Sequence, residues 1–423
     1  MGRLENVPPA PPAYHASMNK EEFFRHARGD VAGPLDGVRI VDCTTAWAGP
    51  MAGCLLADLG ADVVHIDLPG DMPPQVPPLI GGTSLNFVNQ TVNRNKRSLA
   101  LDLRRPEGRD VFLDLVATAD AVVENFRPGT LANWGIGYEH CAAVKPDIVY
   151  VSISGWGQYG PWAERAGYDP AALAAGGWMS LNGSPDGPPV KAPTFLADDL
   201  AGLHGALSTL AALNHRDRTG EGQHVDVCLL DALLFHCDGL LSLGATDVPL
   251  QRWGAQVNVT HPCDVYTCAD GSLYLAIALD SHWRRLCEVM GRGDLARAPG
   301  YGRNGERLDN REAVNAVVAE WCAPLPVSEA VDRLLAAGLV VARLNTFAEA
   351  AREPHVLARD MLQTVTLSDG SDAPLTGPAA KFSRTPTRVR WAAPVPGAHN
   401  ADVLGELGYE ADRLDELRAA GVI

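Results

Sequence analysis

The sequence is poor in positive charge. It has 35 Lys and Arg against 51 Asp and Glu, a formal net charge of −16, and only five of its 423 residues are lysines. Because binding to nucleic acid requires clustered positive charge opposite the phosphates, this composition argues against nucleic acid as a partner. Long hydrophobic runs are also missing. No stretch of 18 apolar residues occurs, so we expect no transmembrane helix and no membrane partner.

The N-terminal sequence lacks the apolar core of a secretory signal peptide. The nine cysteines are odd in number, are scattered along the chain and include no C-x-x-C pair. This usage is typical of reduced thiols in a cytoplasmic protein rather than of a disulfide framework or a zinc site. We therefore predict a cytoplasmic protein without a metal.

The common catalytic motifs are absent as well. There is no G-x-S-x-G, no H-E-x-x-H and no P-loop. Residues Gly155–Gly160 match G-x-G-x-x-G after an expected strand, but Pro161 follows and no amphipathic helix begins there. A dinucleotide site needs that helix N-terminus to hold the pyrophosphate. We therefore interpret the pattern as a structural turn and expect no NAD. A nicotinamide-dependent oxidoreductase remains a remote alternative.

What the sequence does contain is an alternation of expected strands and helices between residues 38 and 154. The expected strands are 38–44, 61–69, 98–103, 120–126 and 147–154, and the expected helices between them include 49–60 and 106–119. This alternation predicts an α/β fold, with a Rossmann-like large domain built on a parallel sheet. Ligand-binding loops are then expected at the carboxyl ends of the strands.

The rest of the chain divides by composition. Residues 265–279 read as a hairpin around an Asp-Gly turn, followed by helical segments, which predicts a smaller α+β domain. We expect an N-terminal extension over 1–34, the first part of the large domain over 35–235, the small domain over 236–338, and a C-terminal segment over 339–423 that returns to the large domain.

Two adjacent carboxylates, Asp198 and Asp199, precede a strongly apolar helix expected over 200–213. One interpretation is a helix cap, because Asp accepts hydrogen bonds from the first free amides of a helix. The other interpretation is a catalytic nucleophile. The helix N-terminus stabilises the carboxylate as an anion, so the group would be held in one orientation and permanently ionised. The residues alone leave both interpretations open.

The scarce basic residues gather near the expected strands. Arg94, Lys96 and Arg97 lie within four positions, and Arg104, Arg105 and Arg127 follow strands of the same sheet. Such a local patch is able to hold a phosphorylated ligand against the overall negative charge. The alternative is a solvated turn whose charges serve solubility.

Seven sequence blocks in order identify a resemblance that covers residues 35–423. They are LDGVRIVDCTTAWAGP (35–50), LADLGADVVHID (56–67), NRNKRSLALDLRRPEG (93–108), ADAVVENFRPGTL (119–131), GWGQYGPWAERAGYD (155–169), FLADDLAGLHGAL (195–207) and RTGEGQHVDVCLLDALL (218–234). In combination they resemble the class III CoA-transferases of the CaiB/BaiF type, which include formyl-CoA transferases, carnitine CoA-transferases and α-methylacyl-CoA racemases.

The resemblance implies an interlocked homodimer with coenzyme A, as acyl-CoA, and a carboxylic acid as its substrates. It implies transfer of CoA from an acyl-CoA thioester to the acid through a covalent aspartyl intermediate. The nucleophile of the family corresponds to Asp198, with Asp199 as the adjacent alternative. The matching CoA contacts are Trp47, Ala48, Arg97, Leu101, Asp102, Leu103, Arg104, Asn125, Phe126 and Arg127.

The resemblance also places Tyr168 and Asp169 at the substrate pocket. Racemases of the family carry a histidine as second base where this chain has Tyr168. A tyrosine, with an ordinary pKa of about 10, is a poor base near neutral pH. We therefore expect a CoA-transferase rather than an acyl-CoA racemase or isomerase. A CoA-binding protein without catalytic activity is a further alternative.

Overall fold

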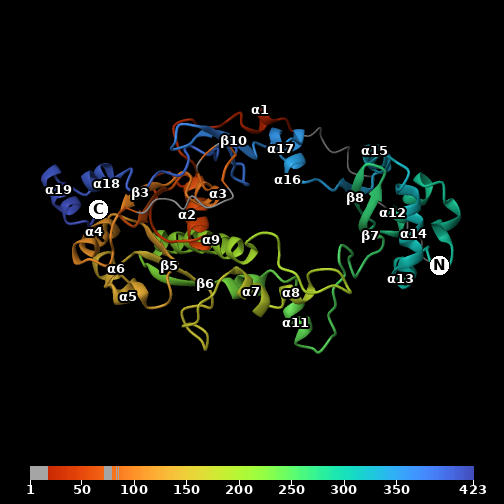
Figure 1. Cartoon of the computed structure of the whole chain (residues 1–423), viewed down its shortest axis with the longest axis horizontal. Coiled ribbons are helices and arrows are strands. Elements are labelled where there is room, and N and C mark those ends of the chain that lie inside the picture. Colours follow the sequence, from red (N-terminus) through yellow and green to blue (C-terminus); the bar gives the residue numbers. More distant parts are fainter. Residues whose placement is uncertain (1–17, 71–78, 82, 84) are drawn as a thin grey trace, which may run out of the picture.

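The computed structural model describes residues 18–70, 79–81, 83 and 85–423, and its two α/β bodies are joined by two separate segments (Figure 1). The predicted N-terminal extension is described only from Met18 onward and includes the short helix α1 (Lys20–Phe23). It packs against the C-terminal part of the chain. The Lys20 ammonium lies 2.6 Å from the Asp360 carboxylate, and the amide of Arg28 donates to the carbonyl of Arg384 at 2.7 Å.

The large domain is built on a six-stranded parallel sheet with the order β3-β2-β1-β4-β5-β6. Its strands are β1 (Arg39–Cys43), β2 (Asp62–Asp67), β3 (Arg97–Ala100), β4 (Ala121–Glu124), β5 (Val149–Ser154) and β6 (Gln223–Cys228). All residues of β4 and β5 are buried, as expected for a parallel sheet covered on both faces. The predicted α/β class and the parallel sheet are confirmed.

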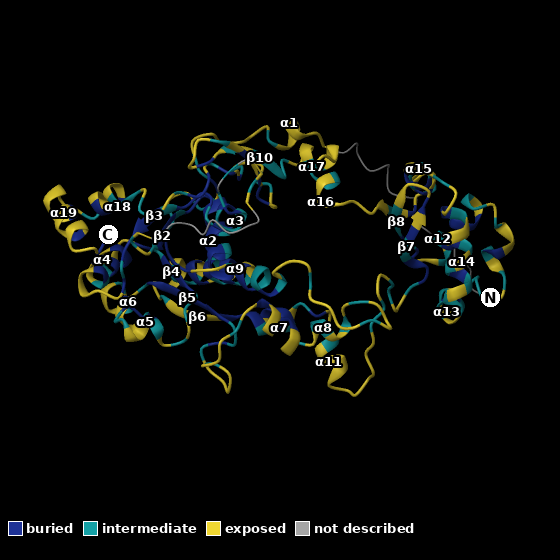
Figure 2. Cartoon of the chain, viewed as in Figure 1, coloured by how far each residue is buried: buried dark blue, intermediate teal, exposed yellow. Residues whose placement is uncertain are grey.

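Helices cover the two faces of this sheet with separate cores. One face packs against α2 (Ala48–Asp58), α7 (Asp169–Ala175), α9 (Leu196–Thr219) and α10 (Leu229–Phe235). The other packs against α4 (Pro106–Ala117), α5 (Thr130–Asn133), α6 (Tyr138–Val144), α18 (Asn400–Glu406) and α19 (Ala411–Ala419). The last two helices thus bring the C-terminus back to the large domain. Figure 2 shows the buried sheet between these helices.

The small domain contains a three-stranded antiparallel sheet, β7 (Cys263–Cys268), β8 (Gly271–Ala276) and β9 (Val340–Arg343). It is covered by α12 (Asp280–Val289), the 3₁₀ helix η1 (Gly293–Arg297), α13 (Asn304–Asp309), α14 (Arg311–Cys322) and α15 (Val327–Ala336). Strand β9 pairs with β8, so the small domain extends through Arg343. This corrects the predicted boundary at residue 338, because LVVAR completes the small sheet instead of rejoining the large one.

The other predicted boundary, at residue 236, also lies too early for the small sheet. Helices α8 (Trp178–Leu181) and α11 (Leu240–Gly244) lie in the connecting region together with the loop before β7. The Arg252 guanidinium in this loop donates to the carbonyls of Ser180, Ser184 and Gly187, at 3.1, 3.0 and 2.7 Å. The connection is therefore tied to the α8 region at Arg252. Residues 257–261 are bonded instead to the small domain, because the carbonyls of Val257 and His261 accept the guanidinium groups of Arg311 and Arg307.

A further segment returns from β9 to the large domain. It contains α16 (Phe347–Ala350), α17 (Pro354–Ala358) and a two-stranded antiparallel sheet of β10 (Leu362–Thr366) and β11 (Asp372–Thr376). It lies beside α3 (Phe87–Val92), and the Asn95 carboxamide fastens it by accepting the amides of Arg390 and Trp391. Within the described ranges, none of the helices combines the length and apolar character needed to cross a bilayer.

The strand order reverses between β1 and β4, and the loops after these two strands are bonded to each other. The Asn125 carboxamide accepts the amide of Thr45 at 2.8 Å and donates to the carbonyl of Thr45 at 2.7 Å. In open α/β sheets, ligands bind outside the carboxyl ends of the strands at such a reversal. The fold therefore directs attention to the residues around the β1–α2 loop.

Candidate active site

Helix α9 brings a pair of carboxylates to this edge of the sheet. It begins at Leu196, earlier than predicted, so Asp198 and Asp199 lie inside its first turn and Phe195 is the N-cap residue. The interpretation of either aspartate as the helix cap is therefore wrong. Asp169 takes that role instead: its Oδ1 accepts the amide of Ala197 at 2.7 Å.

The Asp198 carboxyl group lies in an acidic environment. Burial raises its pKa to about 7, and the nearby charges of Asp169 and Asp199 act in the same direction. The charge of Lys191 opposes them. The expectation that Asp198 is permanently ionised is therefore wrong, because desolvation and two like charges outweigh the helix N-terminus. Such a value lets the group exist as a carboxylate or as an acid near neutral pH.

Asp199 differs from Asp198 in its contacts. The indole Nε1 of Trp47 donates to Asp199 Oδ1 at 2.7 Å, and the Trp47 ring packs against Phe195 with 5.0 Å between ring centroids. No hydrogen bond joins the Asp198 carboxylate to another side chain or amide among the described residues. Asp199 thus fixes the β1–α2 loop, whereas Asp198 keeps its oxygens available for reaction.

Two glycines of α9 allow this helix to pack closely, one against α2 and the other against β5. A Cβ on Gly202 would lie 2.9 Å from the carbonyl oxygen of Ala48, and a Cβ on Gly205 would lie 2.6 Å from Cδ1 of Ile153. Both distances are shorter than ordinary carbon contacts. The small residues therefore set the close spacing of α9 against α2 and β5.

A buried lysine that the sequence analysis did not single out connects β1 to the start of α2. Lys96 is 0 % exposed, and its Nζ donates to Asp42 Oδ2 at 2.6 Å, to the Pro50 carbonyl at 2.9 Å and to Asn93 Oδ1 at 2.9 Å. Thr44 donates to the same aspartate. Burial alone would raise the pKa of Asp42, but the charges of Lys96 and His65 outweigh it and hold that pKa below its ordinary range. Nothing in the spacing of Lys96 distinguishes it from a surface lysine.

Most of the predicted CoA contacts gather at the carboxyl edge of the sheet. Leu101 and Leu103 are buried after β3, and Asp102 between them pairs with Arg104 at 2.7 Å. The amide of Asp102 also donates to the carbonyl of Val422 at 2.9 Å, so the C-terminus fixes this loop.

The loop after β4 completes this edge. Asn125 is bonded to Thr45, Phe126 packs on Trp134 with 5.4 Å between ring centroids, and Arg127 is exposed. Together with Trp47 and Ala48, these residues surround the point where the strand order reverses.

Arg97 does not join them. It is the first residue of β3 and therefore lies at the amino edge of the sheet. Its guanidinium pairs with Asp62 at 2.6 Å and with Glu406 at 2.7 Å. The prediction of Arg97 as a CoA contact is therefore corrected: the side chain ties β2 and β3 to the C-terminal helix α18.

The other two charges of the basic patch are also internal. Arg94 pairs with Asp58 at 2.6 Å and is buried, as is Lys96. Neither the phosphate interpretation nor the solvated-turn interpretation of residues 93–97 therefore holds.

The two predicted pocket residues, Tyr168 and Asp169, differ in their exposure to solvent. Tyr168 precedes α7 and is 71 % exposed, whereas Asp169 is 1 % exposed beneath the start of α9. Asp169 acts on the site by capping α9 and through its charge, not by lining an open pocket. Residues 155–168 contain no helix, and α7 begins only at Asp169. The G-x-G-x-x-G stretch is thus the structural turn that was predicted.

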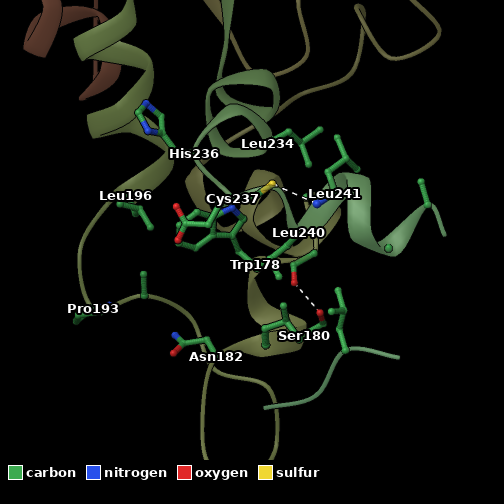
Figure 3. A pocket seen from close by; sticks show the side chains of 18 residues that line it. Trp178, Ser180, Asn182, Pro193, Leu196, Leu234, His236, Cys237, Leu240 and Leu241 are labelled. Atoms are coloured by element: carbon green, nitrogen blue, oxygen red, sulfur yellow. Dashed lines mark hydrogen bonds between the residues drawn. The ribbon is translucent and has the colours of Figure 1, made fainter. Parts of the chain in front are cut away.

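A cavity of about 670 Å³ lies beside the start of α9, with Pro193 and Leu196 in its wall (Figure 3). Its walls come from α8, the start of α9, the end of α10 and α11, and are mainly apolar, with Trp178, Leu196, Leu234 and Leu241 among them. His236 lines the cavity and shares a hydrogen bond with His204 at 3.0 Å between their Nε2 atoms. No group of three or more potential metal ligands is found in the part of the chain that the structure describes.

Comparison with known proteins gives a consistent result. The profile of "CoA-transferase family III" matches residues 35–400. A succinyl-CoA–L-malate CoA-transferase beta subunit of Chloroflexus aurantiacus is 35 % identical over 399 residues, covering 92 % of this chain and 98 % of that protein. A succinate–glutarate CoA-transferase of Agrobacterium fabrum is 35 % identical and covers 88 % and 96 %. A succinyl-CoA:mesaconate CoA-transferase of Haloarcula hispanica is 37 % identical and covers 89 % and 97 %.

Solved structures agree with the sequence relatives. A CaiB/BaiF family protein from Brucella suis superimposes with a TM-score of 0.80 at 32 % identity, covering 89 % of this chain and all of that one. Rv3272 from Mycobacterium tuberculosis superimposes with a TM-score of 0.79 at 29 % identity, covering 88 % and 99 %. The family match spans most of the chain and agrees with the parallel sheet and the acidic site at its carboxyl edge. This chain therefore belongs to CoA-transferase family III and is a transferase of CoA groups.

Proposed function

We propose that Asp198 is the covalent nucleophile of a reaction that moves CoA from an acyl-CoA thioester to a carboxylic acid. A carboxylate oxygen of Asp198 attacks the thioester carbonyl, the C–S bond breaks, and a mixed anhydride and the CoA thiolate result. The thiolate then attacks the aspartyl carbonyl. This step releases the donor acid as its carboxylate and leaves an aspartyl-CoA thioester.

The second half of the reaction repeats these steps in reverse order with the acceptor. The acceptor carboxylate attacks the aspartyl-CoA thioester, forming a new mixed anhydride and freeing the thiolate. The thiolate attacks the acceptor carbonyl, which gives the new acyl-CoA and restores the Asp198 carboxylate. No water, metal or redox partner enters this balance, and the thioester energy is conserved at each exchange.

The observation that carries the proposal is the contrast between the two adjacent aspartates. Asp199 Oδ1 is bonded to Trp47 at 2.7 Å, whereas no hydrogen bond of a described residue holds Asp198. Asp198 also lies in the first turn of α9, where unpaired backbone amides favour the negative charge that develops on the attacked carbonyl.

The bound CoA is proposed to lie along the carboxyl edge of the sheet. The residues that support this placement are Trp47 and Ala48 after β1, Leu101, Asp102, Leu103 and Arg104 after β3, and Asn125, Phe126 and Arg127 after β4. Arg97 is left out because it lies at the opposite edge. The named relatives that use succinyl-CoA support a succinyl-type thioester as the donor.

The interlocked homodimer is part of the same proposal. Two separate segments connect the domains, which is the arrangement that interlocking with a second chain requires (Figure 1). Exposed apolar side chains along α9, α10 and α11, namely Leu203, Leu207, Phe235 and Leu241, support a partner on this side of the molecule. Light scattering coupled to size exclusion would test the dimer, and a monomeric mass in an active sample would exclude it.

The nucleophile is tested by trapping. The wild-type enzyme is incubated with succinyl-CoA, quenched with hydroxylamine and digested, and we expect the hydroxamate of Asp198 in the mass spectrum. Asp198→Ala and Asp198→Asn are expected to lose both the adduct and transfer. Asp186→Asn, on an exposed loop, is the matched control and should retain both. Transfer that survives Asp198→Ala contradicts the proposal, and α-proton exchange in deuterated water without transfer would favour the racemase.

A further inference from the structure

The proposed reaction brings anionic substrates to a site that is already acidic. Asp169, Asp198 and Asp199 act on one another closely enough for their charges to raise the pKa of Asp198. A substrate with a second carboxylate adds still more negative charge. Such a ligand requires a positive group close to the nucleophile, because like charges at short range are strongly unfavourable in a partly desolvated site.

Lys191 is the one basic residue among the named electrostatic influences on Asp198. Its Nζ donates to the carbonyl of Ala192 at 2.7 Å and to the carbonyl of Thr194 at 2.8 Å, which fixes the ammonium in the turn just before α9. It lies 5.5 Å from the centroid of the Phe195 ring. The side chain is 38 % exposed, so its charge faces both the site and the solvent.

The third N–H of this ammonium is not satisfied by a hydrogen bond within the described residues. The nearest carboxylate oxygen, Asp169 Oδ2, lies 3.6 Å away, and that buried oxygen itself has no hydrogen-bond partner in the described part of the chain. A lysine donates three hydrogen bonds, of which the two carbonyls take two. The third N–H has no hydrogen-bond partner among the described residues, but the ammonium is ion-paired with Asp169, so a ligand carboxylate would share its charge with Asp169.

We infer that Lys191 is a specificity-determining residue that binds the second carboxylate of a dicarboxylic acyl group while the first is attached to CoA or to Asp198. This inference rests on the proposed function of Asp198. It adds the substrate class: diacids and their CoA thioesters, in preference to monoacids of the same chain length. A lysine suits this role because a compact ammonium accepts a carboxylate from several directions.

The experiment compares succinyl-CoA with butyryl-CoA, which has the same number of acyl carbons but no second carboxylate. The variants are Lys191→Met and Lys191→Arg. The control is Lys145→Met, which removes a lysine that pairs with Asp147 at 2.7 Å before β5, at the amino edge of the sheet. Each protein is assayed for kcat/KM with both thioesters and for formation of the Asp198 adduct.

We expect Lys191→Met to lower kcat/KM for succinyl-CoA by at least about tenfold, the loss typical of one charged hydrogen bond, and to change the value for butyryl-CoA by less than about threefold. Lys191→Arg should recover part of the preference for succinyl-CoA, and Lys145→Met should leave it unchanged. An equal fall for both thioesters would overturn the inference, because a structural role, or an effect on the ionisation of Asp198 alone, lowers both values alike. A wild-type enzyme without preference for succinyl-CoA would also overturn it.

The two proposals fail in different ways. If no variant and no thioester gives an Asp198 adduct while transfer proceeds, the proposed nucleophile is wrong. If wild-type and Lys191→Met both form the adduct and discriminate equally between the two thioesters, only the role of Lys191 is wrong.

Discussion

Asp198, the proposed nucleophile, should lower the free energy of unfolding of the domain that contains it. Its pKa is about 7 in the folded chain, against 3.8 as the ordinary value. A carboxyl group whose pKa is raised on folding binds its proton more tightly in the folded state. The free energy of unfolding therefore falls as the pH rises from the unfolded pKa through the folded one. Replacing Asp198 with asparagine removes this titration.

The size of the effect follows from the two pKa values. One pKa unit corresponds to about 1.4 kcal/mol, so the shift from 3.8 to about 7 amounts to at most about 4 kcal/mol once the carboxyl is ionised in both states, above pH 8. At pH 5 the unfolded chain has lost its proton and the folded chain has not, and the penalty is about 2 kcal/mol. Asp198→Asn should thus gain about 2 to 3 kcal/mol more stability at pH 8 than at pH 5.

Thermal or urea unfolding at pH 5 and at pH 8 measures this difference. Asp198→Asn should be more stable than the wild type at pH 8 by a clear margin and nearer to it at pH 5. Asp186→Asn, exposed on its loop, should show no such divergence. A variant that tracks the wild type at both pH values, or that is less stable at pH 8, would refute the reasoning that burial and like charges hold Asp198 close to neutrality.

Three further predictions concern the same site. The rate of adduct formation should fall about tenfold per pH unit below about pH 7, because only ionised Asp198 attacks the thioester. Asp199→Asn removes a like charge and should move this pH profile to lower pH. A flat profile between pH 5 and 8 would contradict this prediction. Lys96→Met should destabilise the chain by about 3 to 5 kcal/mol in urea unfolding, since it leaves Asp42 buried without its partner, and Lys96→Met with Asp42→Asn should recover part of that loss. Removal of Val422 and Ile423 should raise the KM for acyl-CoA, because the amide of Asp102 loses its hydrogen-bond acceptor. It should also lower the melting temperature, because the core loses two apolar side chains. Unchanged kinetics would show that the C-terminus does not support the loop after β3.

The sequence predicts the large domain well because its signals are local. Near-continuous apolar runs such as those of β4 and β5 are stable only when both faces of the strand are buried, as in a parallel sheet between two layers of helices. The segment 339–423 is predicted to return to the large domain, but its first strand, β9, pairs with β8 of the small sheet, because nothing in the residues of a single strand specifies its partner. The start of α9 was missed because its cap comes from Asp169, a residue far away in the sequence.

At the candidate site, too, the sequence does not reveal which side chains become partners in the folded chain. The family motifs identify Asp198 and the loops around the strand reversal. The three basic residues at positions 94, 96 and 97 look equivalent in the sequence, yet each is committed to a different internal carboxylate, on Asp58, Asp42 and Asp62 respectively. The register of β1, β2 and β3 brings Asp42 and Asp62 to Lys96 and Arg97, whereas Asp58 at the end of α2 meets Arg94 through the packing of that helix.

These internal ion pairs change what the net charge of −16 means for function. Composition alone suggests that Arg94, Lys96 and Arg97 are free to bind a polyanionic ligand. All three are instead paired with carboxylates that hold β1, β2, β3 and α2 together. In the proposed placement of CoA, binding would therefore depend on the exposed Arg127, on the loop of Arg104, and on backbone amides at the strand ends, within an otherwise negative field. Positive charge is scarce near the proposed nucleophile as well, since the ammonium of Lys191 opposes the negative charge of Asp198 and Asp169. Under the proposed function, specificity for anions would therefore come from a few cations placed close to the reaction and not from attraction of anions at a distance.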